Sequence, residues 1–138
     1  MPRAKLFCIF SSMVLYLCSL ALPAANKFLG FECLVAGWFG LAAGVGFGWL
    51  ANPLLYASWV LIAIGKNVAS LLVCLVSVVL ILSTLAAPSM VASTSGEVTQ
   101  ITRFGPGFWF WVASALVALL CAAHAQLRSQ SRSMSGVA

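Results

Sequence analysis

The sequence predicts an all-α integral membrane protein: a bundle of four transmembrane helices with a short interfacial or re-entrant helix between spans 2 and 3. Two observations predict this fold class. Hydrophobic residues make up 63% of the chain and charged residues only 7%, whereas soluble domains are about 45–50% apolar and about 25% charged. The apolar residues also lie in runs long enough to cross a bilayer. This composition excludes a soluble globular domain, a disordered chain, a collagen-like chain and a nucleic-acid-binding protein.

The first predicted span covers residues 6–22. It follows two basic residues and ends before Pro23, and its length is at the short end of the spanning range. A basic start and a small-residue end are also typical of a signal peptide, so cleavage within residues 1–25 stays an alternative. Because Leu22 and Pro23 make a poor cleavage site, we expect a retained helix.

The middle of the chain has no charged residue between Cys33 and Gly65. One straight helix of that length would measure about 50 Å at about 1.5 Å per residue. The hydrocarbon core of a bilayer is only about 30 Å thick, so one straight span cannot account for the run. Asn52 and Pro53 mark the natural break, because asparagine favours turns and proline restricts the residue before it.

This break divides the uncharged run into two parts. We predict span 2 at residues 34–50, followed by an apolar segment at residues 53–65 that is too short to cross a standard bilayer. The second segment is an interfacial helix, a re-entrant helix or part of a kinked span. Its Tyr56 and Trp59 are the expected membrane-interface anchors, since amphipathic aromatic rings favour the headgroup level.

The third span is predicted at residues 68–87 and the fourth at residues 108–123, with a polar loop between them. The fourth span begins with an aromatic cluster. Trp109 and Trp111 in this cluster are expected to anchor the helix at the membrane interface. After the fourth span the chain becomes polar, and residues 126–138 form a C-terminal tail that follows a single transmembrane domain at residues 1–125.

The basic residues predict the orientation of this domain. With four spans, one side holds five of the seven lysines and arginines, and the positive-inside rule assigns that side to the cytoplasm. Lys27 and Arg103 fall on the other side. We therefore expect both termini in the cytoplasm and a location in the bacterial inner (plasma) membrane. The larger group contains Arg3, Lys5, Lys66, Arg128 and Arg132.

Small residues recur every four positions in span 2. In a continuous helix they would lie near one face, and helices in lipid associate through such close backbone contacts. This helix-packing face fits another helix of the same chain, a membrane-protein partner or a second copy in a homo-oligomer. The fourth span repeats the pattern more weakly with Ser114 and Ala118. The residues of the span 2 face are Ala36, Gly40, Gly44 and Gly48.

The sequence predicts no catalytic residue, cofactor site or metal site. The five cysteines have no metal-ligand spacing. The one histidine, His124, comes at the end of span 4, where a cation would complement the helix dipole. None of the spans has an acidic or basic residue in its middle, although coupled transport usually needs one.

In size and span count the chain resembles the small four-helix multidrug transporters. The hallmark of that family is a carboxylate inside the first span, and residues 6–22 contain none. We therefore expect a non-enzymatic membrane protein that acts through helix–helix interaction, as an accessory subunit or an immunity-type protein of a membrane complex. The alternative is a small passive channel, a holin-like pore or a transporter. The expected partners are the lipid bilayer and a membrane protein, and not nucleic acid.

Overall fold

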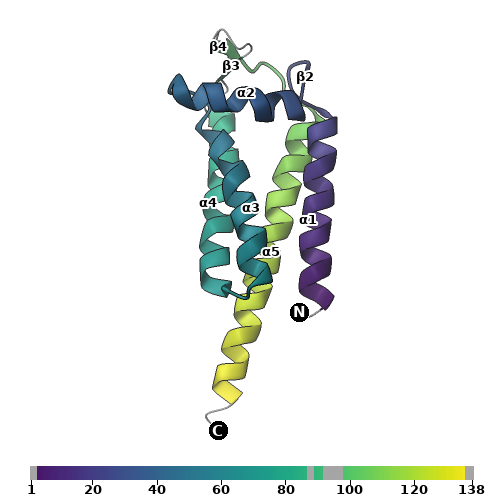
Figure 1. The fold of residues 1–138 in the computed structure, drawn as a ribbon, viewed down its shortest axis with the longest axis vertical. Helices are drawn as coiled ribbons and strands as arrows, with labels where there is room; N and C mark the ends of the chain where they lie inside the picture. The colour runs from purple at the N-terminus through teal and green to yellow at the C-terminus, as the bar shows by residue number, and fades with distance from the viewer. Residues whose placement is uncertain (1–2, 87–88, 92–97, 136–138) are drawn as a thin grey trace.

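The fold is mostly helical, and the computed structural model describes residues 3–86, 89–91 and 98–135. Four helices lie side by side, and a fifth crosses one end of them together with two short antiparallel strand pairs, β1–β2 and β3–β4 (Figure 1). The elements are α1 (Arg3–Ala21), β1 (Pro23–Ala25), β2 (Phe28–Leu29), α2 (Gly30–Ala42), the 3-10 helix η1 (Phe47–Leu50), α3 (Ala51–Ala63), α4 (Asn67–Ala86), β3 (Ser89–Val91), β4 (Val98–Gln100) and α5 (Pro106–Ser135).

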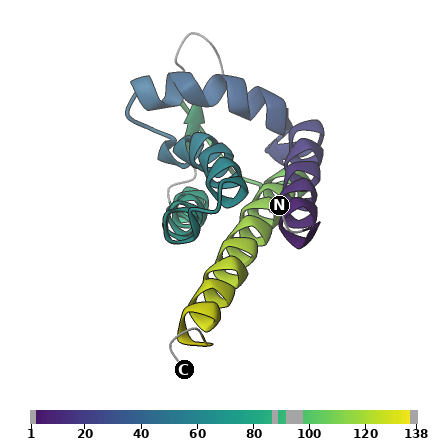
Figure 2. The same cartoon turned by 60° about the horizontal axis from the view of Figure 1, so that its bottom comes forward.

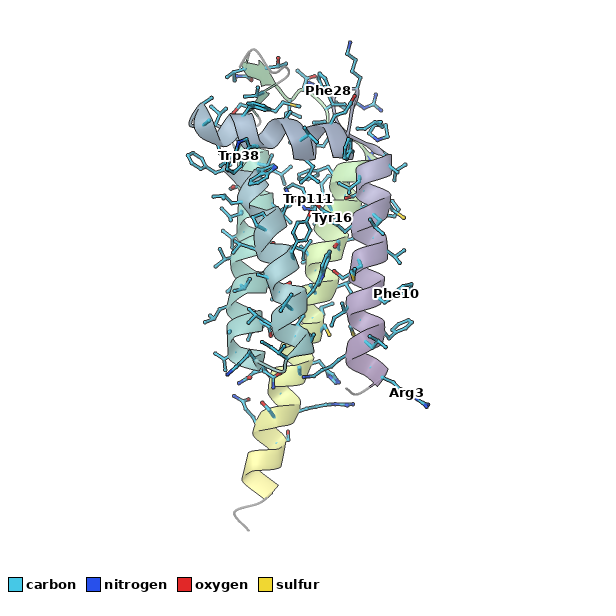
Figure 3. All side chains as sticks on the ribbon, in the orientation of Figure 1. Arg3, Phe10, Tyr16, Phe28, Trp38 and Trp111 are labelled. Atoms are coloured by element: carbon cyan, nitrogen blue, oxygen red, sulfur yellow. The ribbon has the colours of Figure 1, made fainter. Side chains whose placement is uncertain are left out.

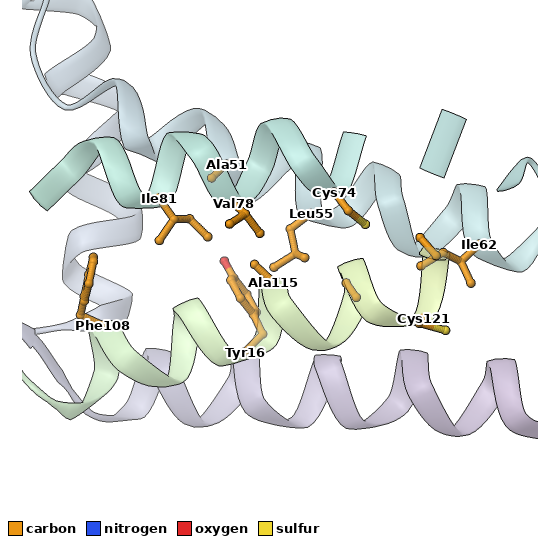
Figure 4. Packing of buried hydrophobic residues seen from close by; sticks show 12 residues of the cluster. Tyr16, Ala51, Leu55, Ile62, Cys74, Val78, Ile81, Phe108, Ala115 and Cys121 are labelled. Atoms are coloured by element: carbon orange, nitrogen blue, oxygen red, sulfur yellow. The ribbon is translucent and has the colours of Figure 1, made fainter. Parts of the chain in front are cut away.

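The bundle consists of α1, α3, α4 and α5. Helix α1 packs mainly on α5, α3 packs on α4, and α4 also packs on α5. The core between them combines a few large side chains with small ones, which lets the helices approach closely (Figure 4). Large apolar side chains cover the outside instead, among them Phe7, Leu72 and Leu120, as expected for helices that face lipid.

Three helices, α1, α4 and α5, are long and apolar enough to cross a membrane. The segments Gly30–Ala42 and Phe47–Ala63 pass the same test only when taken together, and they are bent by 115° relative to each other. The described residues therefore contain three helices that are long and apolar enough to span a membrane, or four if this bent pair is counted as one span.

The predicted break at Asn52-Pro53 is wrong. Helix α2 ends at Ala42, and the chain turns through Gly44 and Gly46, whose φ angles are 73° and 71°. Glycine adopts this left-handed conformation without steric cost, so it permits the sharp bend. Pro53 lies in the first turn of α3, where its missing N–H removes no helical hydrogen bond.

The two predicted segments on either side of the expected break, residues 34–50 and 53–65, therefore have other positions than the sequence predicts. Residues 34–50 do not form one helix. Helix α2 lies across the end of the bundle, whereas η1 leads directly into α3 (Figure 1). For residues 53–65 the sequence predicts an interfacial helix, a re-entrant helix or part of a kinked span, and residues 53–63 of this segment lie inside the bundle as part of α3. The reason is packing: Leu55 and Ile62, separated by two helical turns, are both fully buried in the core.

Helix α5 continues well past the predicted end of span 4 at residue 123. Its backbone is helical through Ser135 and projects beyond the other three helices of the bundle (Figure 1). The sequence-based boundary at Gln126 is therefore not a helix boundary. Residues 136–138 of the predicted tail lie outside the described part of the chain, as does residue 87 at the end of predicted span 3.

The two ends of the bundle carry different numbers of basic residues. Lys5 Nζ donates a hydrogen bond to Asn67 Oδ1 at 3.4 Å, which joins the starts of α1 and α4 at the end near the termini. At the other end, Asn26 N donates to the Arg103 carbonyl oxygen at 2.8 Å and links the β1–β2 turn to the segment before α5. Lys5 and Arg103, which the sequence assigns to opposite sides of the membrane, therefore lie at opposite ends of the bundle.

We predict that a periplasm-dependent reporter, such as alkaline phosphatase, will be inactive when fused to the C-terminus. The same reporter inserted at Ser95, which lies outside the described residues, is expected to be active. The reason is that the end carrying most of the basic residues should stay in the cytoplasm. Strong activity of the C-terminal fusion would overturn this orientation, and a matched cytoplasm-dependent fluorescent fusion serves as the control.

Candidate functional site

The inner faces of the bundle carry small polar side chains. Ser12 of α1 and Ser114 of α5 are both fully buried and bond reciprocally across the helix contact. Ser12 Oγ donates to the Ser114 carbonyl oxygen at 2.8 Å, and Ser114 Oγ donates to the Ser12 carbonyl oxygen at 2.9 Å. Ala118, one turn further along α5, is only 1% exposed. Ser114 and Ala118, named from the sequence as packing residues, thus lie at a close contact within the chain.

A second polar cluster joins α1 to α3. Tyr16 OH donates to Asn52 Oδ1 at 3.1 Å, and the Tyr56 hydroxyl bonds the Tyr16 hydroxyl. Trp59 Nε1 donates to Ser12 Oγ at 2.9 Å. These groups reach from the first turn of α3, at Asn52, to Trp59, and they are uncharged. The cluster therefore satisfies polar groups inside the bundle without placing a charge there.

Tyr56 and Trp59, which the sequence predicts as membrane-interface anchors, contact another helix of the bundle. Both residues lie in the middle of α3 and bond side chains of α1. The hydroxyl and the indole N–H have found partners inside the bundle, so they do not need water or lipid headgroups. Trp109 and Trp111 differ, because they lie in the first turns of α5 at the end covered by α2, and Trp109 is 54% exposed.

Helix α2 forms the roof of a cavity at this end of the bundle. The roof reaches from α1 to the α3–α4 pair (Figure 2), and Tyr16 and Trp111 lie below it (Figure 3). The cavity has a volume of about 120 Å³, and its walls are mostly apolar. Its polar side chains come from α1, α2, η1, α3, α4, β3 and α5, and no side chain among the described residues that line it is acidic or basic. The polar lining residues are Tyr16, Ser19, Trp49, Asn52, Thr84, Ser89 and Trp111, with the thiol of Cys33.

Two of these lining residues have an unpaired polar atom. Within the described part of the chain, the buried side-chain polar atoms that lack a hydrogen-bond partner are Thr84 Oγ1 and Trp111 Nε1. Buried polar atoms in native proteins nearly always have a partner, and leaving one unpaired costs about 1–3 kcal/mol. Both atoms belong to residues that line one cavity, which makes this cavity the candidate functional site.

Glycine residues shape the roof and walls of the cavity. Gly37 of α2 is closely approached by the Trp49 ring, and Trp49 Nε1 donates to the Leu34 carbonyl oxygen at 2.6 Å. Gly48 of η1 packs against Thr84 and the Leu80 carbonyl oxygen of α4. Bare backbone at these positions lets α2 and η1 come close to their neighbours.

The expectation of one continuous small-residue face is wrong. Ala36 and Gly40 lie in α2, Gly44 lies in the bend, and Gly48 lies in η1. Because the helix ends at Ala42, the four-residue spacing no longer places them on one side. Gly40 and Gly48 are buried within the chain, whereas a Cβ atom at Gly44 would meet no other atom within 4 Å.

Sequence reasoning named Gly40, Gly48 and Trp111 of the cavity lining, as packing residues and an anchor, but it missed the polar lining residues of α1, although one signal was present. Ser12, Tyr16 and Ser19 recur at the three- and four-residue spacing of one helix face, and all three are buried. A polar inner face in an apolar helix predicts contact with polar groups of other helices. The hydrogen-bond partner Asn52 and the further lining residue Thr84 could not be identified from this pattern, because they lie far along the chain.

The cavity lining can form hydrogen bonds with a bound molecule. It offers hydroxyl, amide and indole groups, which form hydrogen bonds but are neutral near pH 7. Among the described residues, no three His, Cys, Asp or Glu side chains lie together as a metal site would require. Comparison of the chain with protein-family models, with curated proteins and with solved structures finds no match.

Proposed function

We propose that this chain is a non-enzymatic membrane protein that binds a small, uncharged, mostly apolar molecule in the cavity beneath α2. The observation that carries the proposal is the pair of unpaired polar atoms, Thr84 Oγ1 and Trp111 Nε1, in residues of one apolar cavity lining. A hydroxyl or carbonyl group on the ligand would accept from the indole N–H and pair with the threonine hydroxyl. The ligand would thereby remove the cost of leaving these atoms unpaired.

The size and polarity of the cavity restrict the ligand. Its volume of about 120 Å³ is close to that of engineered apolar cavities that bind benzene. A charged ligand is disfavoured, because no lining side chain would pair with it and burying an unpaired charge is very costly. The expected ligand class is therefore a single ring or a short branched chain that carries one hydroxyl or carbonyl group.

Photoaffinity labelling tests this proposal in the full chain, reconstituted in lipid nanodiscs. The probe is a benzyl alcohol analogue that carries a diazirine, and mass spectrometry locates the labelled residues. We expect labels on lining residues such as Leu34 and Met90, from different elements. Benzyl alcohol should compete for the label and benzoate should not. Labels confined to outward-facing residues such as Leu72 would mean that the probe contacts the protein only through lipid.

We predict that Thr84→Val will weaken binding of benzyl alcohol about fivefold, because one net hydrogen bond is worth about 1 kcal/mol. Binding of toluene should not change, since toluene has no hydroxyl group. Without a bound ligand, the Thr84→Val variant should be as stable as the wild type or more stable, because a buried hydroxyl without a partner has been removed. Ser83→Ala, at the neighbouring exposed position of α4, is the matched control for binding. Equal effects on both ligands would contradict the proposed pairing.

A second proposal is the one expected from the sequence, an accessory subunit or immunity-type protein that acts through helix–helix interaction in the inner membrane. The observation that favours it is the extension of α5 beyond the other helices, where Leu127 is 63% exposed. An isolated helical segment is only marginally stable, so a partner would stabilise it. Truncation after Ala125 should then abolish co-assembly with that partner while the bundle still accumulates. Unchanged assembly would remove this support.

A further inference from the structure

Helix α2 differs from the other helices in both direction and length. It spans Gly30–Ala42 and is bent by 115° from the segment that follows it. A helix of 13 residues measures about 20 Å at about 1.5 Å per residue. This is well short of the hydrocarbon thickness of about 30 Å, so α2 alone cannot cross the bilayer. Figure 1 shows it lying across the end of the bundle.

The two sides of α2 have different environments. One side faces the protein, where Gly37 meets Trp49 and Gly40 is buried near Val45 and Val91. The other side carries Phe31, Val35, Trp38 and Phe39, which we call the outer stripe. Their exposed fractions are 59%, 53%, 62% and 40%. The spacing of three to four residues places them along one side of the helix.

The outer stripe continues the apolar outside of the bundle. At the same end, Leu17 of α1 and Leu82 of α4 are 61% and 44% exposed, and Phe47 beside α2 is 57% exposed. An apolar surface of this extent is normally covered by another molecule. Leu17 and Leu82 belong to helices that are long and apolar enough to cross a membrane, so lipid is expected around them. Because the outer stripe lies at the same end of the bundle as these side chains, lipid is the molecule expected to cover it as well.

The charges around α2 fit a position at the boundary between lipid and water. Glu32 is the charged residue of α2, and its Oε2 accepts a hydrogen bond from Leu29 N at 2.7 Å at the start of the helix. Lys27 and Arg103 lie in the connecting segments next to α2 and are exposed. Charged groups at one level and large aromatic side chains beside them are typical of a membrane interface.

We infer that α2 lies in the plane of the bilayer, with the outer stripe inserted at the boundary between headgroups and acyl chains. This surface is a second functional feature and does not depend on the ligand proposed for the cavity. It holds the roof of that cavity at a fixed depth, because α2 is anchored to lipid on one side and to η1 and β3 on the other.

Fluorescence quenching of Trp38 by brominated phosphatidylcholine tests the inference in liposomes. The contribution of Trp38 is the difference between the wild type and Trp38→Phe, which keeps an aromatic ring beside Trp49, the ring that Trp38 contacts at a centroid distance of 5.7 Å. We expect this contribution to be quenched most by bromine near the headgroup and least by bromine near the chain end. Trp59→Phe is the matched control: Trp59 is partly buried and bonded to Ser12, so its contribution should respond weakly to every bromolipid.

Three outcomes would overturn the inference. Strongest quenching by bromine near the chain end would place α2 inside the membrane core. Quenching by aqueous iodide but not by bromolipid would place the stripe in water. Quenching by neither would mean that protein, such as a second copy, covers it. A spin label at Val35→Cys, in a background without the native cysteines, provides an independent depth measurement on the same stripe.

Discussion

Replacing Gly48 by leucine is expected to cause one of the two largest losses of stability in this protein. Gly48 is buried where η1 meets α4, and a Cβ atom there would lie 3.2 Å from the Leu80 carbonyl oxygen and closer still to the Thr84 hydroxyl. The backbone oxygen cannot move aside without displacing α4. Overpacking of this kind typically lowers the free energy of unfolding by about 1–3 kcal/mol. Unfolding in mixed micelles, followed by circular dichroism, measures the change.

The matched control is Gly44→Asn in the bend before η1. Its φ of 73° lies in the left-handed region, which asparagine tolerates better than most residues, and a Cβ atom would meet nothing within 4 Å. We expect this variant to accumulate and unfold like the wild type. If Gly44→Asn lost stability while Gly48→Leu did not, the two residues would have to lie in one continuous helix that buries Gly44, as the sequence pattern first indicated.

Replacing Ser114 by leucine is expected to cause the other large loss. Ser114 is fully buried, and it lies against Ser12, which is also fully buried. A leucine would force α1 and α5 apart, with a typical overpacking cost of about 1–3 kcal/mol. It would also remove the hydrogen bond from Ser114 Oγ to the Ser12 carbonyl oxygen, and interhelical bonds in membranes average about 0.6 kcal/mol. The same unfolding measurement in micelles reports the sum.

Two further variants separate the steric cost from the loss of the hydrogen bond. Ser114→Ala removes only the hydroxyl, so we expect a loss of about 0.6 kcal/mol. Ser83→Leu makes the same substitution on the exposed side of α4, where we expect almost no change. A Ser114→Leu variant as stable as Ser83→Leu would show that α1 and α5 do not pack closely at this point.

Much of the architecture could be predicted from the order of apolar and charged residues. The helices α1, α4 and α5 cover most of the predicted spans at residues 6–22, 68–87 and 108–123, of which residue 87 lies outside the described residues. In a bilayer each helix must satisfy its own backbone hydrogen bonds, so a long apolar run determines a helix without reference to the rest of the chain. The same reasoning grouped the basic residues at the two ends of the bundle.

The site could be predicted only in part, because its residues act through contacts with distant segments. Ser114 and Ala118 were identified as packing residues from their small size, and they lie at a helix contact. Tyr56 and Trp59 were assigned to the membrane interface from their residue type alone. Their actual partners are on α1, and no pattern around residues 56–59 indicates them.

The sequence by itself determined that the chain is a membrane protein, where its three longest helices lie and which basic residues share an end. These properties depend on local composition and on the thickness of the bilayer. Only the tertiary structure decided where the uncharged segment bends and how the cavity forms. The bend at Gly44 and Gly46 is favourable because it lets Gly48 pack against α4 and α2 cover the bundle. The cavity brings together Tyr16, Thr84 and Trp111, whose distances depend on how the helices pack and not on the residues beside each of them.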